Sequence, residues 1–282
     1  MIRRLAVVGL GLLGGSIAKA SRQRGLAREV VAVGRRQESL AAALSDGVVE
    51  RATTDLAAGV AGADFVVLAT PVATIEALVP KVWEAATDGA IITDVGSTKG
   101  PIVRTAERLA AGRPLAFVGS HPMAGSEVAG YRAARADLFE GALVIVTPTD
   151  ATDRLGLKRV SEFWEALGAR VSQMDPEQHD RAVAAVSHLP HLVAYALVEA
   201  VARMDPSSFG VAARGFKDTT RIATSDARLW REIFLTNRAA LGPALAAFKA
   251  SLAELERLVS EGDAVALEET LDRIRTMRRR LE

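Results

Sequence analysis

The N-terminal part of the chain runs from an apolar strand-like segment, Leu5–Val8, directly into the glycine-rich sequence GLGLLG at residues 9–14. A GxGxxG pattern between a strand and a helix is typical of dinucleotide-binding α/β domains. The first glycine permits a tight turn, the second lets the backbone approach a pyrophosphate, and the third lets the helix pack closely on the strand. We therefore expect cofactor contacts from Gly9, Gly11, Leu12, Leu13 and Gly14; the alternative is a glycine-rich turn without a ligand.

Short apolar runs alternate with helix-like segments over the first 174 residues. This alternation predicts a parallel, doubly wound sheet of the Rossmann type, and the continuously apolar runs indicate strands that are covered on both faces. The expected strands are Leu5–Val8, Val30–Val33, Phe65–Ala69, Ile91–Asp94, Ala116–Gly119, Leu143–Thr147 and Arg170–Met174. The expected helices between them are Ser16–Arg24, Gln37–Leu44, Ala73–Ala86, Ile102–Ala111 and Asp153–Leu167.

The pattern changes at Asp175-Pro176, where an N-cap residue precedes a proline that suits the first turn of a helix. From residue 177 onward no strand is expected, and apolar residues recur at helical spacing. We place a domain boundary here, with a dinucleotide-binding domain at 1–175 and an all-helical domain at 176–282. The apolar faces of so small a helical domain exceed what one core can cover, which favours a homodimer through this domain.

Composition excludes several classes of protein. The 282 residues include 35 Lys and Arg and 34 Asp and Glu, a formal net charge of +1, so a general nucleic-acid or membrane-surface binder is not expected. The absence of cysteine removes disulfides and thiolate chemistry, and four histidines make a His-rich metal site unexpected. Because no uninterrupted stretch of 18 apolar residues occurs, we expect no membrane span and a soluble, cytoplasmic protein.

The end of the second expected strand bears on the choice of cofactor. An NAD site usually has Asp or Glu there to accept the ribose hydroxyls. This chain has Gly34, Arg35 and Arg36 instead, and guanidinium groups suit a 2′-phosphate. The sequence therefore favours NADP over NAD, unless both arginines merely face solvent and either cofactor is accepted.

Polar residues follow three further strands, where ligands of open α/β sheets bind. Thr70-Pro71 can pass over a nicotinamide ribose, Ser97 can hold a substrate hydroxyl, and Lys99 can attract an anionic substrate. His121 follows a buried strand between Ser120 and Pro122, and imidazole titrates in the range needed to take a hydroxyl proton. Structural roles remain open for each: a loop-binding histidine, a helix cap and a surface lysine.

Two further polar sites lie in the helical part. In the sequence SHLPH at residues 187–191, Pro190 should kink or loosen the helix, and His188 and His191 can share one face. We expect a polar patch facing a cleft rather than a zinc site. The segment 215–221 and the nearby Trp230 bring cations beside a glycine, and Arg221 could clamp a carboxylate or pair with Asp218.

Taken together, these residues resemble the prephenate/arogenate dehydrogenases of tyrosine biosynthesis over essentially the whole chain. Six motifs carry the resemblance in order: GLGLLGGS, TDVGSTKG, GSHPMAGSE, VSHLPH, GFKDTTRIA and LWREIF. The family implies NAD(P)-dependent oxidative decarboxylation of prephenate to 4-hydroxyphenylpyruvate, or of arogenate to tyrosine. From the composition we expect no metal cofactor.

The resemblance also implies roles for individual residues. His121 matches the residue that takes the ring hydroxyl proton, and Ser97 matches the serine that orients that hydroxyl. Arg221 matches the arginine that binds the ring carboxylate. The matches that line the substrate pocket or its entrance are His188, His191, Lys217, Trp230, Ser126 and Glu127.

Two other classes stay open on the sequence alone. A β-hydroxyacid dehydrogenase or pyrroline carboxylate reductase type of enzyme shares the same two-part architecture, but the first needs a catalytic lysine in the helical domain. A non-catalytic NADP sensor would keep the glycines without needing His121, Ser97 and Arg221 together.

Overall fold

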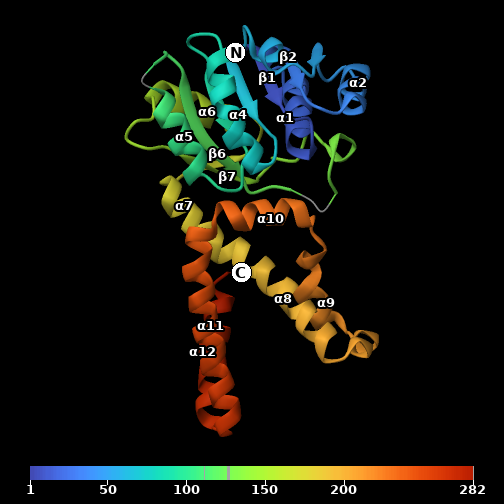
Figure 1. The fold of residues 1–282 in the computed structure, drawn as a ribbon, viewed down its shortest axis with the longest axis vertical. Coiled ribbons are helices and arrows are strands. Elements are labelled where there is room, and N and C mark those ends of the chain that lie inside the picture. Colours follow the sequence, from blue (N-terminus) through green and yellow to red (C-terminus); the bar gives the residue numbers. More distant parts are fainter. Residues whose placement is uncertain (111, 126–127, 282) are drawn as a thin grey trace. The chain divides into compact units, whose positions relative to one another are not determined.

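The computed structural model describes residues 1–110, 112–125 and 128–281. Figure 1 shows a sheet flanked by helices, followed along the chain by helices alone. The strands are β1 (Ile2–Val8), β2 (Ala27–Val33), β3 (Arg51–Thr53), β4 (Phe65–Leu68), β5 (Ile91–Asp94), β6 (Ala116–Pro122), β7 (Leu143–Thr147) and β8 (Arg170–Gln173). The helices among them are α1 (Leu12–Gln23), α2 (Gln37–Ser45), α3 (Leu56–Val60), α4 (Val72–Ala85), α5 (Gly100–Ala110) and α6 (Arg154–Ala166).

Within the described chain the eight strands form one sheet in the order β3-β2-β1-β4-β5-β6-β7-β8. The first six strands in this order are parallel, which is the dinucleotide-binding arrangement expected from the sequence. The prediction of a fully parallel sheet was wrong at one pair, because β7 runs antiparallel to β6. The described part of the β6–β7 connection holds only the short 3-10 helix Tyr131–Ala133, and without a crossover helix the chain returns in the opposite direction.

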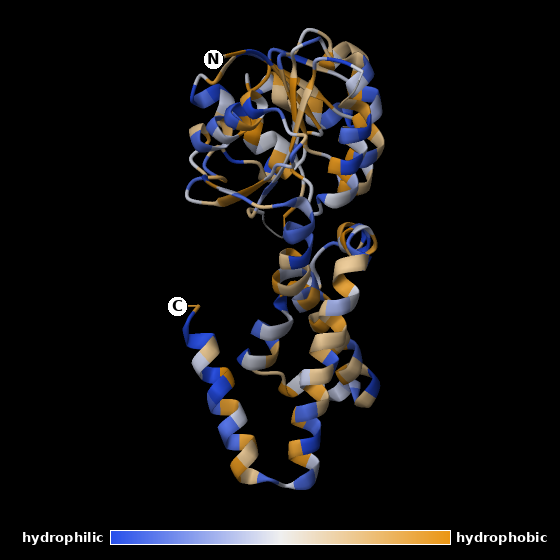
Figure 2. Cartoon of the chain, turned by 90° about the vertical axis from the view of Figure 1, so that its left-hand side faces the viewer, coloured by the Kyte–Doolittle hydropathy of each residue, from blue (hydrophilic) through white to orange (hydrophobic). Residues whose placement is uncertain are grey.

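The core lies on both faces of this sheet, as alternation along the central strands requires. In β1, Leu5 and Val7 point into one apolar cluster, together with Ile17 of α1 and Trp164 of α6. Ala6 points into the opposite cluster, which α3, α4 and α5 help to build. Figure 2 shows the strands largely in hydrophobic colours, and Figure 1 shows α4 and α5 on one side of the sheet. The predicted doubly wound architecture is confirmed.

The helical part starts where the sequence predicts. The Asp175 carboxylate accepts the backbone N–H groups of Glu177 and Gln178 at 2.9 and 3.1 Å, and Pro176 opens α7 (Pro176–Val183). A π-helical turn, Ala184–His188, then leads into α8 (Leu189–Met204). This widened turn directly before Pro190 is the loosening that the proline predicts.

The remaining helices complete two compact units, 1–237 and 238–282. The first unit ends with α9 (Arg214–Thr220) and α10 (Ala227–Thr236), and the second consists of α11 (Arg238–Glu261) and α12 (Ala264–Arg279). The compact units therefore divide later in the chain than the predicted boundary at 175/176, which stays a prediction.

One helical run in the described chain, Pro176–Met204, is long and apolar enough to cross a membrane by length and composition alone. Polar and charged residues interrupt this run, so it contains no uninterrupted stretch of 18 apolar residues. Only 22% of its apolar window is buried. The same run carries His179 and Asp180, whose side chains are hydrogen-bonded to residues of the sheet region.

Candidate active site

The glycine-rich turn fits a dinucleotide. Gly9 has a φ of 104°, and a Cβ there would lie 2.6 Å from the carbonyl oxygen of Ala69, so only glycine suits this turn. A Cβ on Gly11, by contrast, would meet no atom within 4 Å. Gly11 also caps α1 without a side-chain hydrogen bond, which leaves backbone donors at the helix start. Open space beside uncapped N–H groups is what a pyrophosphate requires.

The neighbouring strand ends complete this face of the sheet. The hydroxyl of Thr70, just after β4, is buried without a hydrogen-bond partner among the described residues. Because buried polar groups are normally hydrogen-bonded, this hydroxyl is available to bond to a ligand. Arg35 and Arg36 follow β2 and are both exposed. Gly34 lies between them and the strand, and its backbone N–H donates to the carbonyl of Thr53 at 3.1 Å.

A fully buried ion pair joins Asp94, the last residue of β5, to Lys99 in the turn that follows. The Lys99 ammonium contacts the Asp94 carboxylate and donates to the carbonyl of Ser120 at 2.8 Å, and both charged side chains are 0% exposed. Burial lowers the pKa of Lys99, although the Asp94 charge opposes this shift. The expectation that Lys99 meets a substrate anion does not match this position, because its ammonium holds two neighbouring strand ends together.

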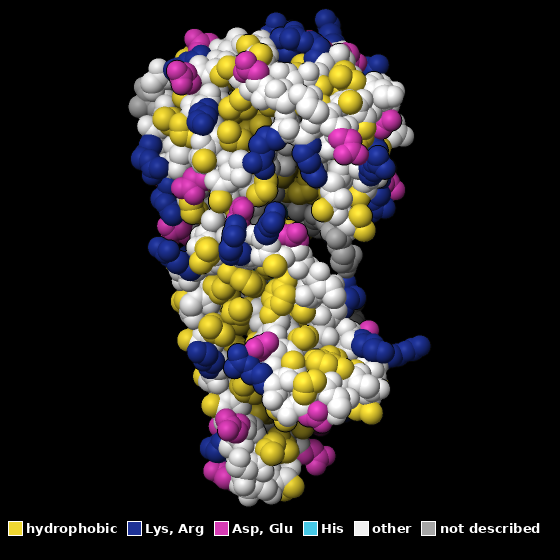
Figure 3. Space-filling model, turned by 45° about the vertical axis from the view of Figure 1, so that its right-hand side comes forward, with side chains coloured by type: hydrophobic (Ala, Val, Ile, Leu, Met, Phe, Trp, Pro, Cys, Tyr) yellow, Lys and Arg dark blue, Asp and Glu magenta, His cyan; other side chains and the backbone are white. Residues whose placement is uncertain are grey.

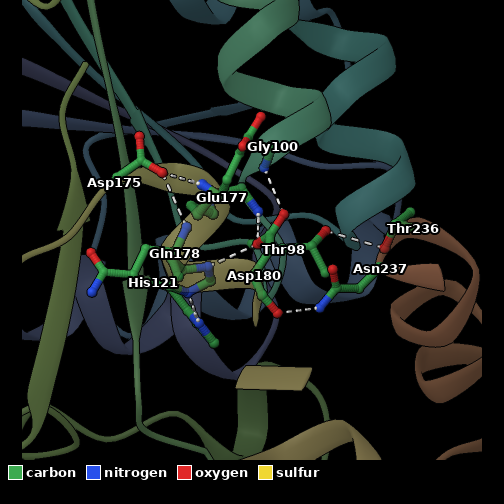
Figure 4. Close-up of polar contacts among 12 residues, drawn as sticks. Thr98, Gly100, His121, Asp175, Glu177, Gln178, Asp180, Thr236 and Asn237 are labelled. Atoms are coloured by element: carbon green, nitrogen blue, oxygen red, sulfur yellow. Dashed lines mark hydrogen bonds and ion pairs between the residues drawn. The ribbon is translucent and has the colours of Figure 1, made fainter. Parts of the chain in front are cut away.

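His121 stands at the end of β6 in a chain of three side chains. Its Nδ1 lies 2.9 Å from Nε2 of His179, and Nδ1 of His179 lies 2.8 Å from Oδ1 of Asp180. The Asp180 carboxylate also accepts the backbone N–H groups of Lys99 and Gly100, at 2.8 Å each (Figure 4). Burial, followed by the charges of His179, Lys99 and His188, lowers the pKa of His121 well below its ordinary value. His121 is therefore neutral near pH 7 and able to accept a proton.

A second group of aromatic and basic residues lies on the helices. His191 stacks on Trp230 with ring centroids 3.4 Å apart, and His188 meets the same indole edge-on at 6.1 Å. The pKa of His191 is lowered by burial and further by the charge of Arg221, which places that guanidinium near the ring. Asn237 joins the two groups, since its amide donates to the Asp180 carbonyl and lies 3.1 Å from Nδ1 of His188. Burial lowers the pKa of His188 to about 4.

Comparison with known proteins gives the family. A family model for the prephenate dehydrogenase nucleotide-binding domain matches residues 17–173, and one for the prephenate dehydrogenase dimerization domain matches residues 175–273. The chain belongs to the prephenate dehydrogenase family.

Individual relatives agree with this assignment. Prephenate dehydrogenase of Bacillus subtilis is 36% identical over 83% of this chain, although the match spans only 64% of that protein. The crystal structure of Aquifex aeolicus prephenate dehydrogenase with hydroxyphenyl propionate and NAD+ has a TM-score of 0.93 at 36% identity, covering 100% of this chain and 99% of its own. Synechocystis arogenate dehydrogenase has a TM-score of 0.86 at 32% identity, with 99% and 100% covered.

The other expected residues of this family member divide into three groups. Ser97 is half-buried in the turn after β5, and its hydroxyl bonds to no residue that the structure describes. Lys217 is exposed on α9, with no side-chain bond to any described residue. Ser126 and Glu127 lie outside the described residues. Over residues 1–110, 112–125 and 128–281, no group of three or more His, Asp or Glu side chains is placed to hold a metal ion.

Sequence reasoning missed His179, Asp180, Asp94 and Asn237. A signal was present for the first two, because His179 is the one histidine of four that received no role, and it precedes an aspartate in the first turns after Asp175-Pro176. Asn237 contacts Asp180 and His188, which are distant in sequence, so no local pattern reveals its role. Asp94 lies only five residues before Lys99, but nothing in the sequence shows that the two side chains are buried together.

We expect Lys99→Met to destabilise the protein by about 3–5 kcal/mol, because it leaves the buried Asp94 carboxylate without its cation. The free energy of unfolding in urea measures this effect. As a control, Lys158→Met removes a lysine that is 71% exposed and pairs with Glu162, and should change stability by less than about 0.5 kcal/mol. Equal stabilities of the two variants would contradict the structural role of Lys99.

Proposed function

We propose that this protein catalyses NAD(P)-dependent oxidative decarboxylation of prephenate to 4-hydroxyphenylpyruvate. The observation that carries the proposal is His121 at the end of β6, held neutral by burial and bonded through Nδ1, with no bond from the described residues to its Nε2. Arogenate is the second candidate substrate, because an arogenate dehydrogenase has nearly the same fold over the whole chain. Formation of reduced nicotinamide, measured with each substrate, tests both.

The chemistry asks mainly for positioning. Loss of CO2 makes the substrate ring aromatic, so the driving force resides in the substrate, and a bound nicotinamide dinucleotide supplies the hydride acceptor. His121 accepts the proton of the ring hydroxyl, and Ser97, on the adjacent strand end, orients that hydroxyl. Arg221 pairs with the ring carboxylate beside the stacked rings of His191 and Trp230. A β-hydroxyacid dehydrogenase is disfavoured, because the lysines of the helical part that the structure describes are Lys217, exposed on α9, and Lys249, exposed on α11.

We expect His121→Asn to lower kcat by roughly 10²–10⁴, the range for loss of a positioned general base. Cofactor affinity, measured by fluorescence titration, should stay within a few fold, because His121 acts on the substrate hydroxyl. A kcat within a few fold of the unmodified protein would end the catalytic assignment.

Arg221→Ala should raise KM for the substrate about ten- to a hundred-fold, because it removes a charge-assisted bidentate contact. Arg221→Lys should restore binding only in part, since an ammonium lacks the planar fork. Arg228→Ala, an exposed arginine on α10, is the matched control. A selective loss of cofactor binding in Arg221→Ala would contradict the role.

We further propose that NADP is preferred over NAD, by about ten- to a hundred-fold in kcat/KM. Arg35 and Arg36 are exposed and make no side-chain bond to the described residues, so either can meet a 2′-phosphate. The double change Gly34→Asp with Arg36→Ala should reverse the preference; a Cβ on Gly34 would meet only the Leu40 side chain, at 3.3 Å. Arg154→Ala on α6 serves as the control. An unmodified protein that uses NAD equally well would refute the preference.

We also propose a homodimer through the helical part, in a cytoplasmic protein. Support comes from the dimerization-domain model over residues 175–273 and from apolar residues exposed on α10, α11 and α12. Leu235 is 60% exposed and Val265 70%. Figure 3 shows exposed hydrophobic side chains gathered on part of the face that it draws.

A further inference from the structure

The hydrogen-bonded chain from His121 to Asp180 has a defined direction. Asp180 can only accept when ionised, so Nδ1 of His179 must carry the proton between them. Nε2 of His179 is then unprotonated and can only accept a hydrogen bond, so Nδ1 of His121 must carry a proton and donate it to this bond. The two bonds together leave Nε2 of His121 unprotonated, which is the form that can accept a substrate proton.

The environment keeps Asp180 ionised. Burial raises its pKa, but the hydrogen bonds from His179, Gly100 and Lys99 outweigh burial, and the pKa is lowered. The carboxylate is thus a fixed negative charge behind two imidazoles. The other titratable groups facing the chain are Lys99, which is paired with Asp94, and His188, which bonds to Asn237.

We propose that His179 and Asp180 form a proton relay behind His121, which fixes its tautomer and draws the accepted proton away from the substrate. This inference rests on the proposed function. The hydroxyl O–H bond of the substrate breaks and an N–H bond forms at Nε2 of His121. The Nδ1 proton of His121 then passes to Nε2 of His179, whose Nδ1–H stays bonded to Asp180.

This transfer has a physical advantage. A positive charge on His121 lies in a buried site near the Lys99 ammonium, whereas the same charge on His179 forms an ion pair with Asp180 at 2.8 Å. The step involves no oxidation or reduction within the relay. After the product leaves, Nε2 of His179 returns its proton to Nδ1 of His121, and the proton on Nε2 of His121 is released to solvent. His179 and Asp180 touch neither substrate nor cofactor in this scheme and are positioning residues.

The discriminating variant is His179→Gln. A glutamine amide can accept from His121 and donate to Asp180, so it keeps both hydrogen bonds but cannot take up a proton. If His179 only holds His121 in place, the His179→Gln variant retains the activity of the unmodified protein. If His179 takes up the proton, the variant should lower kcat by about ten-fold or more, with KM for substrate and cofactor within about three-fold. The acid limb of the kcat/KM profile should also move to lower pH, because protonated His121 loses its route to the Asp180 ion pair.

Gln178→Ala, an exposed neighbour on α7, is the matched control and should leave kcat and the pH profile unchanged. A His179→Gln variant with unmodified kcat and an unmoved acid limb would overturn the relay. If the unmodified protein turns over neither prephenate nor arogenate, the proposed function fails, and the relay is then judged by a measurement that needs no activity.

That measurement is the ¹⁵N imidazole spectrum of the histidine-labelled protein, which is simple because the chain has only four histidines. It applies even if the glutamine variant does not fold. We expect His121 and His179 both to be Nδ1–H tautomers at neutral pH, although the Nε2–H form predominates in free histidine. An Nε2–H tautomer at His121 would reverse the direction of the chain and overturn the proposal.

Discussion

The arrangement of the site depends on the hydrogen bonds that the Asp180 carboxylate accepts. It accepts the backbone N–H groups of Lys99 and Gly100 at the start of α5 and the ring N–H of His179 on its own helix. These bonds tie the first helix after the sheet to the end of β5. Because the carboxylate is buried, losing any donor would leave an acceptor that water cannot readily satisfy. The position of His179, and through it the orientation of His121, follows from this anchor.

A second buried charge secures the other side of the same strand ends. Lys99 bonds to Asp94 at the end of β5 and to the carbonyl of Ser120, the residue before His121. Lys99 thus acts twice, with its ammonium on the sheet and its backbone N–H on Asp180. The indole N–H of Trp164 donates to the Ser120 hydroxyl at 3.0 Å and closes the network from the α6 side. His121 lies between these two buried networks, which restrict the rotation of its side chain.

Much of the fold was predictable because its signals are local. The glycine-rich turn, the apolar strands and the cap at Asp175-Pro176 each lie within a few residues, and the fold class and family that they predicted are confirmed. The antiparallel direction of β7 could not be predicted, because an apolar run of residues does not indicate in which direction a strand pairs with its neighbour. β3 was missed because it is a short, partly exposed edge strand. We expected Lys99 at the substrate, because the sequence does not show that its ammonium is buried and donates to the carbonyl of Ser120, 21 residues away. The assigned contacts with substrate and cofactor stay predictions.

The junction of the two family models has an evolutionary consequence. The models meet between residues 173 and 175, so His121 belongs to one and His179 and Asp180 belong to the other. The hydrogen-bonded chain from His121 to Asp180 therefore crosses the boundary at which recombination would exchange one half for another. A chimera that joins the nucleotide-binding half of one ancestor to the helical half of another must preserve a histidine-to-histidine distance of 2.9 Å across the seam. This contact couples the two halves, although each matches its own family model.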